Sequence, residues 1–111
     1  MVDMSWTIDY YSEVVRLEIE SLPVGIRAAY TRLTSLLEEF GLDLRMPHSR
    51  AMGTGLFELR PKGREGIARV FYCMKVGRKI VVLHSFIKKT NETPKRELDI
   101  AHRRQKEIMA P

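Results

Sequence analysis

The segment from Phe57 to Lys88 most constrains the fold, because three strand-like runs in it are joined by very short links. The runs are rich in β-branched and aromatic residues: Phe57–Lys62, Ile67–Val76 and Lys79–Lys88. Only Gly63–Gly66 and Gly77-Arg78 separate them, and links this short join antiparallel neighbours. The sequence therefore predicts a three-stranded antiparallel meander, in which Pro61 marks an edge or the end of a ladder.

The rest of the chain predicts one more strand and three helices. Met4–Tyr10 has the composition of a short strand, and Ser12 is placed to cap a helix that runs to about Glu20. From Val24 to Phe40, apolar residues recur every three or four positions, as on one face of an amphipathic helix that stops at Gly41. Thr93-Pro94 opens the last helix, and Pro and Gly predict a loop over residues 42–54.

These elements predict an α+β fold in the order β-α-α-β-β-β-α. We expect an antiparallel sheet of about four strands, with two N-terminal helices packed on it, a C-terminal helix, and the helices covering one face. A length of 111 residues, with no internal repeat, predicts a single domain over residues 1–111.

Composition excludes several classes of site. Cys73 is the only cysteine, so no disulfide can form within the chain, and no Cys/His spacing suggests a metal site. The N-terminus MVDMSWTIDY lacks the pattern of a secretory signal, and no apolar run is long enough to span a membrane. We therefore expect a cytoplasmic protein without a membrane segment, metal or cofactor.

Positive charge is concentrated in the meander. The net charge is +5, and residues 56–89 contain nine Lys and Arg but only two acidic residues. Such asymmetry favours a polyanionic partner, nucleic acid above all. The alternative is a solvated strand face that keeps the protein soluble, and charge alone does not decide between the two.

Spacing along the strands supports the nucleic-acid interpretation. Residues two apart in a strand share a face, and a meander would bring cations from all its strands to one end of the sheet: Arg60, Lys62, Arg64, Arg69, Lys88 and Lys89. Arg and Lys suit phosphate. RNA supplies its own nucleophile, the 2′-hydroxyl. Cleavage therefore needs a base that takes the hydroxyl proton, cations that stabilise the phosphorane, and an acid that protonates the leaving 5′ oxygen. A crowded lysine could be the base, and no metal is required.

Other side chains have weaker claims to a site. His48 lies in the loop before the meander and could reach a ligand, whereas His84 is better explained as a structural, hydrogen-bonded histidine. Tyr72 could stack on a base, although packing in the core competes with that role. Cys73 is expected to be a buried small hydrophobe.

Several motifs together resemble the RelE/HigB toxin superfamily, specifically its phage-derived HigB-like branch. They are GLFELR, ARVFY, VVLHSFIKKT and TPKRELDIA, between about Met52 and Arg104. The resemblance implies a small microRNase-like fold, cleavage of mRNA in the ribosomal A site, and neutralisation by a cognate helix-turn-helix antitoxin encoded nearby. Members use loose sets of basic residues on the sheet rather than a fixed triad.

Carried onto this sequence, the resemblance gives a set of hypotheses. Arg60, Arg69, Lys88 and Lys89 would be catalytic, while Lys62 and Arg64, with Tyr72 and His48, would bind RNA. Glu58 stands where some relatives have a basic residue, and no general acid is identified. Two alternatives stay open: an RNA- or ribosome-binding module that blocks translation without cutting, and an inactive phage-derived relic that only binds its antitoxin.

Overall fold

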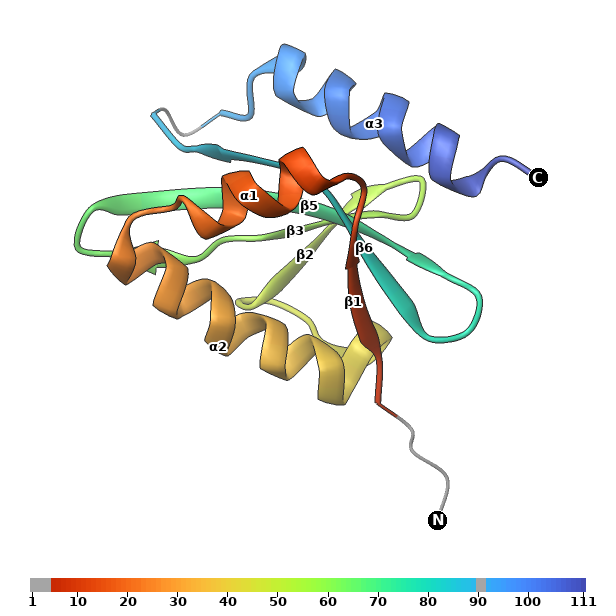
Figure 1. The fold of residues 1–111 in the computed structure, drawn as a ribbon, viewed down its shortest axis with the longest axis horizontal. Helices are drawn as coiled ribbons and strands as arrows, with labels where there is room; N and C mark the ends of the chain where they lie inside the picture. The colour runs from red at the N-terminus through yellow and green to blue at the C-terminus, as the bar shows by residue number, and fades with distance from the viewer. Residues whose placement is uncertain (1–4, 90–91) are drawn as a thin grey trace.

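A six-stranded β-sheet forms the middle layer of the computed structural model, which describes residues 5–89 and 92–111 (Figure 1). The elements, in chain order, are β1 (Thr7–Tyr10), α1 (Glu13–Glu20), α2 (Val24–Phe40), the 3-10 turn η1 (Gly41–Asp43), β2 (Ser49–Gly53), β3 (Leu56–Leu59), β4 (Lys62–Gly63), β5 (Gly66–Lys75), β6 (Lys79–Ile87) and α3 (Lys95–Met109). The predicted α+β class and order of helices and main strands are confirmed, and β2 and β4 are additional short strands.

The sheet has the order β1-β6-β5-β3-β2, with β4 paired to β5. The predicted meander is confirmed, because β5 is antiparallel to β3, β4 and β6. In contrast, β1 runs parallel to β6, with Thr7 opposite Lys79, so the sheet is mixed at this edge. No hairpin joins these two strands, and a short link is what would have forced them to be antiparallel.

Part of the predicted loop over residues 42–54 is a strand. Ser49–Gly53 forms β2 and pairs antiparallel with β3, with Arg50 opposite Glu58. The register shifts between Ala51 and Gly53, as at a β-bulge. The loop prediction was wrong here because a short edge strand with Gly and polar residues has weak intrinsic preference, and its pairing with β3 decides the structure.

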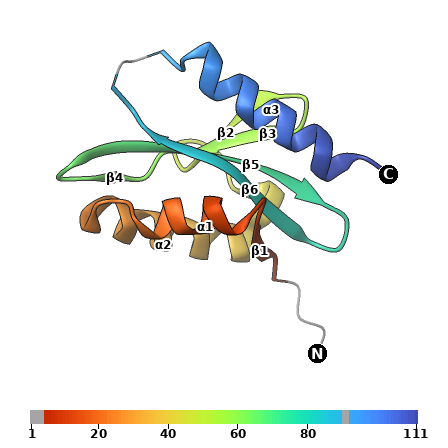
Figure 2. The ribbon, with the colours of Figure 1, turned by 45° about the horizontal axis from the view of Figure 1, so that its top comes forward.

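The first helices pack on one face of the sheet (Figure 2). Ser12 caps α1 by accepting a hydrogen bond from the backbone N–H of Val15 at 3.2 Å, as predicted. The predicted stop of α2 at Gly41 is also confirmed, with a φ of 52° that favours glycine. Buried side chains of the described residues form the core between these helices and the sheet, among them Val15, Ile26, Leu37 and Tyr72.

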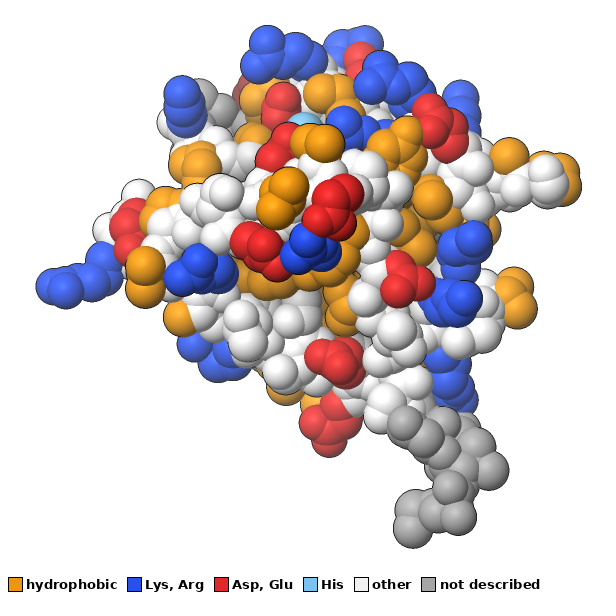
Figure 3. All heavy atoms as spheres, viewed as in Figure 1, with side chains coloured by type: hydrophobic (Ala, Val, Ile, Leu, Met, Phe, Trp, Pro, Cys, Tyr) orange, Lys and Arg blue, Asp and Glu red, His pale blue; other side chains and the backbone are white. Residues whose placement is uncertain are grey.

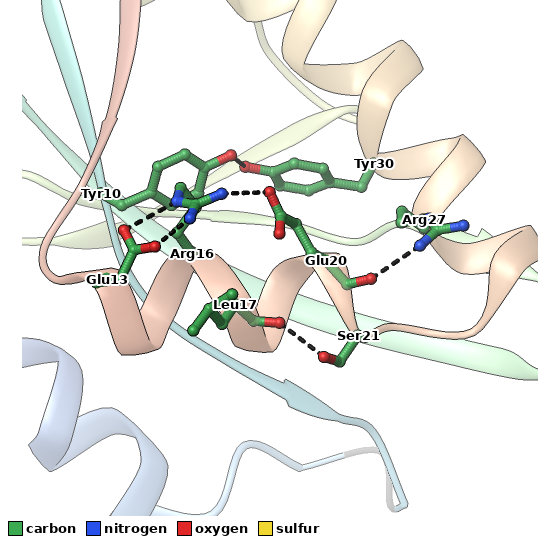
Figure 4. Close-up of polar contacts among 8 residues, drawn as sticks. All are labelled: Tyr10, Glu13, Arg16, Leu17, Glu20, Ser21, Arg27 and Tyr30. Carbon is green, nitrogen blue, oxygen red and sulfur yellow. Dashed lines mark hydrogen bonds and ion pairs between the residues drawn. The ribbon is translucent and has the colours of Figure 1, made fainter.

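Polar contacts fix the corner between α1 and α2 against β1 (Figure 4). The hydroxyl groups of Tyr10 and Tyr30 lie 2.9 Å apart and join β1 to α2. Arg27 donates a hydrogen bond to the backbone carbonyl of Glu20 at 2.8 Å, and the side-chain carboxylate of Glu20 forms an ion pair with Arg16 at 2.5 Å. The two helices therefore act as one layer beneath the sheet.

The C-terminal helix lies on the opposite face, so the helices do not all cover one side (Figures 1 and 2). A second core forms beneath it from Leu56, Phe71, Cys73, Val81, Leu83 and Ala101. The residues of β5 alternate between the two cores, which explains its dense apolar centre: both of its faces are covered. None of the helices in residues 5–89 and 92–111 is long and apolar enough to cross a membrane.

The turn between β4 and β5 docks on the start of α2. The N-cap residue of α2, Pro23, forms no capping hydrogen bond through its side chain. Instead, the Glu65 carboxylate accepts a hydrogen bond from the backbone N–H of Gly25 at 2.9 Å. This hydrogen bond makes the largest contribution to lowering the pKa of Glu65. A Cβ on Gly63 would come within 2.5 Å of the backbone at Gly25 and Ile26. Glycine is therefore needed for this close approach, which fixes the position of the basic turn.

Candidate functional site

The register of the sheet lines up the predicted cations in two rows. In β3 and β4 the pairing with β5 follows one continuous register, with Glu58 opposite Phe71 and Lys62 opposite Ile67. The chain keeps this register between the two strands, since Ala68 N–H donates to the carbonyl of Pro61 at 3.0 Å. Arg60 therefore falls opposite Arg69, although the strand is interrupted at Arg60 and Pro61 between β3 and β4, as Pro61 predicted.

The rows continue across β5 into β6. Arg69 pairs with Phe86. Lys88 donates its backbone N–H to the carbonyl of Ile67 at 2.7 Å, which puts Lys88 in the row of Lys62. Since directly opposite residues share a face, Arg60 and Arg69 form one row, and Lys62 and Lys88 flank Ile67 in the next. All four positions belong to the face that α3 covers further along. In the space-filling view, Lys and Arg side chains project at the left, where β4 turns into β5 and β6 ends (Figure 3).

Arg69, however, is not on the surface. Its side chain is 2% exposed, and its guanidinium lies 3.7 Å from the carboxylate of Glu58, which is fully buried. A short contact also joins Arg69 to the hydroxyl of Thr93, in the segment that leads into α3. The expected open notch around Arg69 is therefore not formed in this structure, because Arg69 is buried and contacts the segment that leads into α3.

Glu58 lies between two arginines. Its other carboxylate oxygen is 3.7 Å from Nε of Arg60, whose side chain is 35% exposed. Neither oxygen of Glu58 has a hydrogen-bond partner among the described residues, so both contacts are ion pairs without hydrogen bonds. The carboxylate thus holds one arginine in the interior and one at the surface, and a group this buried does not itself reach a substrate.

A histidine–carboxylate pair lies beside this cluster. His84 is opposite Phe71, one row away from Arg69, and its Nε2 is 3.0 Å from the carboxylate of Glu97 in α3. The ring is buried and stacks near Phe86, with 6.2 Å between the ring centres. The prediction of a structural, hydrogen-bonded histidine is confirmed. The pair joins α3 to the sheet in the row next to that of Arg69.

The remaining predicted cations differ in position. Lys62 and Arg64 are exposed at the β4–β5 turn, and Lys88 is half-buried. Lys89 is exposed and lies two residues beyond the end of β6, and no strand pairing among the described residues places it in the rows of the other cations. His48 is exposed in the turn that precedes β2. The structure thus groups Arg60, Lys62 and Lys88, and it leaves Lys89 outside the group.

Tyr72 does not contribute to this surface. Its ring is 1% exposed on the face of α1 and α2, stacks on Phe57 at 5.5 Å, and contacts the hydroxyl of Ser49. Burial raises the pKa of Tyr72 to about 12. The hypothesis that it stacks on an RNA base is wrong for this structure, because the phenol belongs to the core. Cys73 is buried as expected, and burial raises the pKa of its thiol.

One cation was missed by sequence reasoning. Arg50 in β2 is exposed and lies opposite Glu58, so it extends the cluster by one strand. Four neighbouring strands then contribute Arg50, Glu58, Phe71 and His84 to one row. The signal was present only in the pairing of β2, which the sequence predicted as a loop.

The described residues contain exposed cations in front of a buried carboxylate, an arrangement suited to binding an anion with several charges. They contain no group of three or more His, Cys, Asp or Glu side chains that could hold a metal ion.

Residues 17–106 match the family model described as "Phage derived protein Gp49-like (DUF891)". The chain belongs to this family. Gp49-like proteins are associated with RelE-type, toxin-like proteins, which agrees with the resemblance at that coarser level. No curated protein matches the chain.

Proposed function

We propose that this Gp49-like protein is the toxin of a type II toxin–antitoxin system and cuts mRNA in the ribosomal A site. The observation that carries the proposal is the shared register of Arg60, Lys62 and Lys88, which brings cations from the end of β3, from β4 and from the end of β6 to one end of one face. Membership of a toxin-like family supports the same assignment.

The proposed chemistry uses the RNA as its own nucleophile. A base removes the proton of a 2′-hydroxyl, and the resulting oxyanion attacks the adjacent phosphorus. The bond from phosphorus to the 5′ oxygen breaks, that oxygen takes up a proton, and a 2′,3′-cyclic phosphate remains. Because negative charge builds on the phosphoryl oxygens in this step, fixed cations accelerate it. The proposal requires no metal and no cofactor.

The positions of the side chains suggest a division of labour. Arg60 and Lys88 would contact the scissile phosphate, with the amine of Lys88 as candidate base, while Lys62, Arg64 and His48 would bind flanking phosphates. Arg69, which is buried behind Arg60, would act as a positioning residue through their common partner Glu58. Direct contact between Arg69 and RNA would require the segment around Thr93 to move.

Expression of variants in a growth assay tests the proposal. Arg60→Ala and Lys88→Ala together should relieve growth arrest, and primer extension on mRNA should lose the new 5′ ends at codon positions. Lys75→Ala and Lys79→Ala, which remove two exposed cations at the opposite, β5–β6 turn, provide the matched control and should leave both effects intact. Unchanged mRNA cleavage by the Arg60/Lys88 double variant would refute the assignment.

A second function is favoured by the burial of Arg69. If this face never opens, the exposed cations could bind RNA or the ribosome and block translation without cleavage. Growth arrest without new mRNA 5′ ends would support that alternative, whereas neither effect, with retained antitoxin binding, would indicate an inactive relic.

A further inference from the structure

A hollow of about 790 Å³ opens between the C-terminal half of α3 and the turn that joins β2 to β3. Phe57, Cys73 and Met74 line it from the sheet, and Met109 lines it from the helix. Gln105 donates to the carbonyl of Thr54 at 2.7 Å and fixes the two walls relative to each other. Figure 3 shows hydrophobic side chains between the end of α3 and the strands below it. The hollow is therefore a preformed, largely apolar groove.

A second hollow extends the groove along the edge of the sheet. It has a volume of about 300 Å³ and shares Leu42 and Phe57 with the first. Leu42, Met46 and Met109 leave about half to two thirds of their surfaces exposed along this path. Methionines adapt to different partner shapes and are common at protein-binding surfaces. An apolar strip of this extent is typical of an interaction site rather than of a solvated surface.

Apart from a buried cysteine thiol, the ionisable side chains that line the groove are basic. His102 and Lys106 line the larger hollow and Arg45 the smaller, and no Asp or Glu is among the described residues that line either one. Strand addition at the neighbouring edge is disfavoured, since β2 is short and has a bulge between Ala51 and Gly53. The groove therefore suits an amphipathic helix, which places apolar side chains in the floor and carboxylates on the rim.

We propose that this groove binds an amphipathic helix of an acidic partner protein. A second copy of the chain fits less well, because its net charge of +5 and basic α3 would face an already basic rim. The groove contains none of the cations assigned to RNA, so the partner would bind without occupying that face. If the proposed function holds, this surface is where a neutralising protein would attach.

A displayed library of helical peptides with randomised faces provides the probe. Selection on the wild-type protein should enrich peptides with an apolar stripe flanked by Asp and Glu. Leu42→Glu and Met109→Glu each place a carboxylate in the groove and should lower the affinity for these peptides roughly tenfold or more. Lys106→Glu should also lower the affinity for these peptides, because it replaces a positive charge at the groove with a negative one. Val76→Glu is the matched control, since Val76 is 98% exposed at the β5–β6 turn and does not line the groove.

Each result decides the proposal. Enrichment of acidic amphipathic peptides that lose affinity in the groove variants but not in Val76→Glu supports it. No enrichment, enriched peptides without acidic residues, or equal binding by all variants would overturn it. A free dimer in light scattering that Leu42→Glu dissociates would also overturn it, with a second copy as the occupant. The groove variants retain every cation assigned to RNA, so their mRNA cleavage separates failure of this inference from failure of the proposed function.

Discussion

The pair formed by Glu58 and Arg69 gives the sharpest energetic prediction. Both side chains are almost completely inaccessible to water, and their charged groups are 3.7 Å apart. At that distance the Coulomb attraction is about 4 kcal/mol for an effective dielectric constant of ~20. Removal of one partner of a buried pair costs about 3–5 kcal/mol, because the other charge remains in the interior. We therefore expect Glu58→Leu to lower the free energy of unfolding by that amount.

Removal of the other partner, Arg69, should lower the free energy of unfolding by less. Arg69→Met leaves Glu58 within 3.7 Å of Arg60, so the carboxylate keeps one cationic neighbour. In the double variant, Glu58→Leu with Arg69→Met, both buried charges are gone and most of the loss should be recovered, since apolar replacement of a buried pair is often neutral. The coupling between the two substitutions should then exceed about 1 kcal/mol.

Urea unfolding followed by far-UV circular dichroism measures these effects, provided that the slopes of the transitions agree. Asp99→Asn removes a partner of the exposed pair with Lys95 and serves as a control that should change little. Two single variants that each cost less than about 1 kcal/mol, with additive effects, would refute the description of the pair as a buried, coupled unit.

Three further predictions concern the surroundings of the site. Folding lowers the pKa of Glu65, so the Glu65 carboxylate stabilises the protein above pH 4.5, its ordinary pKa, and this stabilisation is lost as the pH falls through the folded-state pKa. In the Glu65→Gln variant, the thermal midpoint should therefore depend less on pH in that acidic range. Gly63→Ala should destabilise by about 1–3 kcal/mol, because the added Cβ would clash with the backbone at Gly25 and Ile26. Gly25→Ala should cost less, since the atoms nearest to its Cβ would be the flexible end of the Glu65 side chain; equal losses in urea unfolding would argue against the backbone contact. Tyr72→Phe should lose about 1 kcal/mol with the Ser49 contact but leave mRNA cleavage unchanged, and reduced cleavage by a stable Tyr72→Phe variant would return Tyr72 to the site.

Local patterns were sufficient to predict the elements that local physics determines. Ser12 is a helix cap by its side-chain oxygen, and Gly41 ends α2 because its backbone has a positive φ. The short links after Lys62 and Val76 leave β5 no choice but antiparallel neighbours. These features depend on residues close in sequence, so they could be predicted without knowledge of the packing.

Features that depend on distant pairing could not be predicted in this way. The position of α3 on the second face follows from apolar residues of β5 that point both ways, and the sequence does not say which helix covers which face. Strand alternation correctly put Arg69 on the same face as Phe71, but depth is a separate question. Thr93 contacts Arg69 from the segment before α3, and Glu97 of α3 binds the neighbouring His84, so residues far along the chain enclose a cation that the sequence predicted at the surface.

The candidate site therefore depends on register more than on any one residue. Arg50, Arg60, Lys62 and Lys88 come from different segments, and a slip of one residue in any strand would turn its cation to the other face. Lys62 is held only by the two-residue strand β4, whose position is fixed by Gly63 and Glu65 against the start of α2. Substitutions at that contact should therefore weaken the proposed RNA binding through Lys62 and Arg64, although neither Gly63 nor Glu65 carries a positive charge.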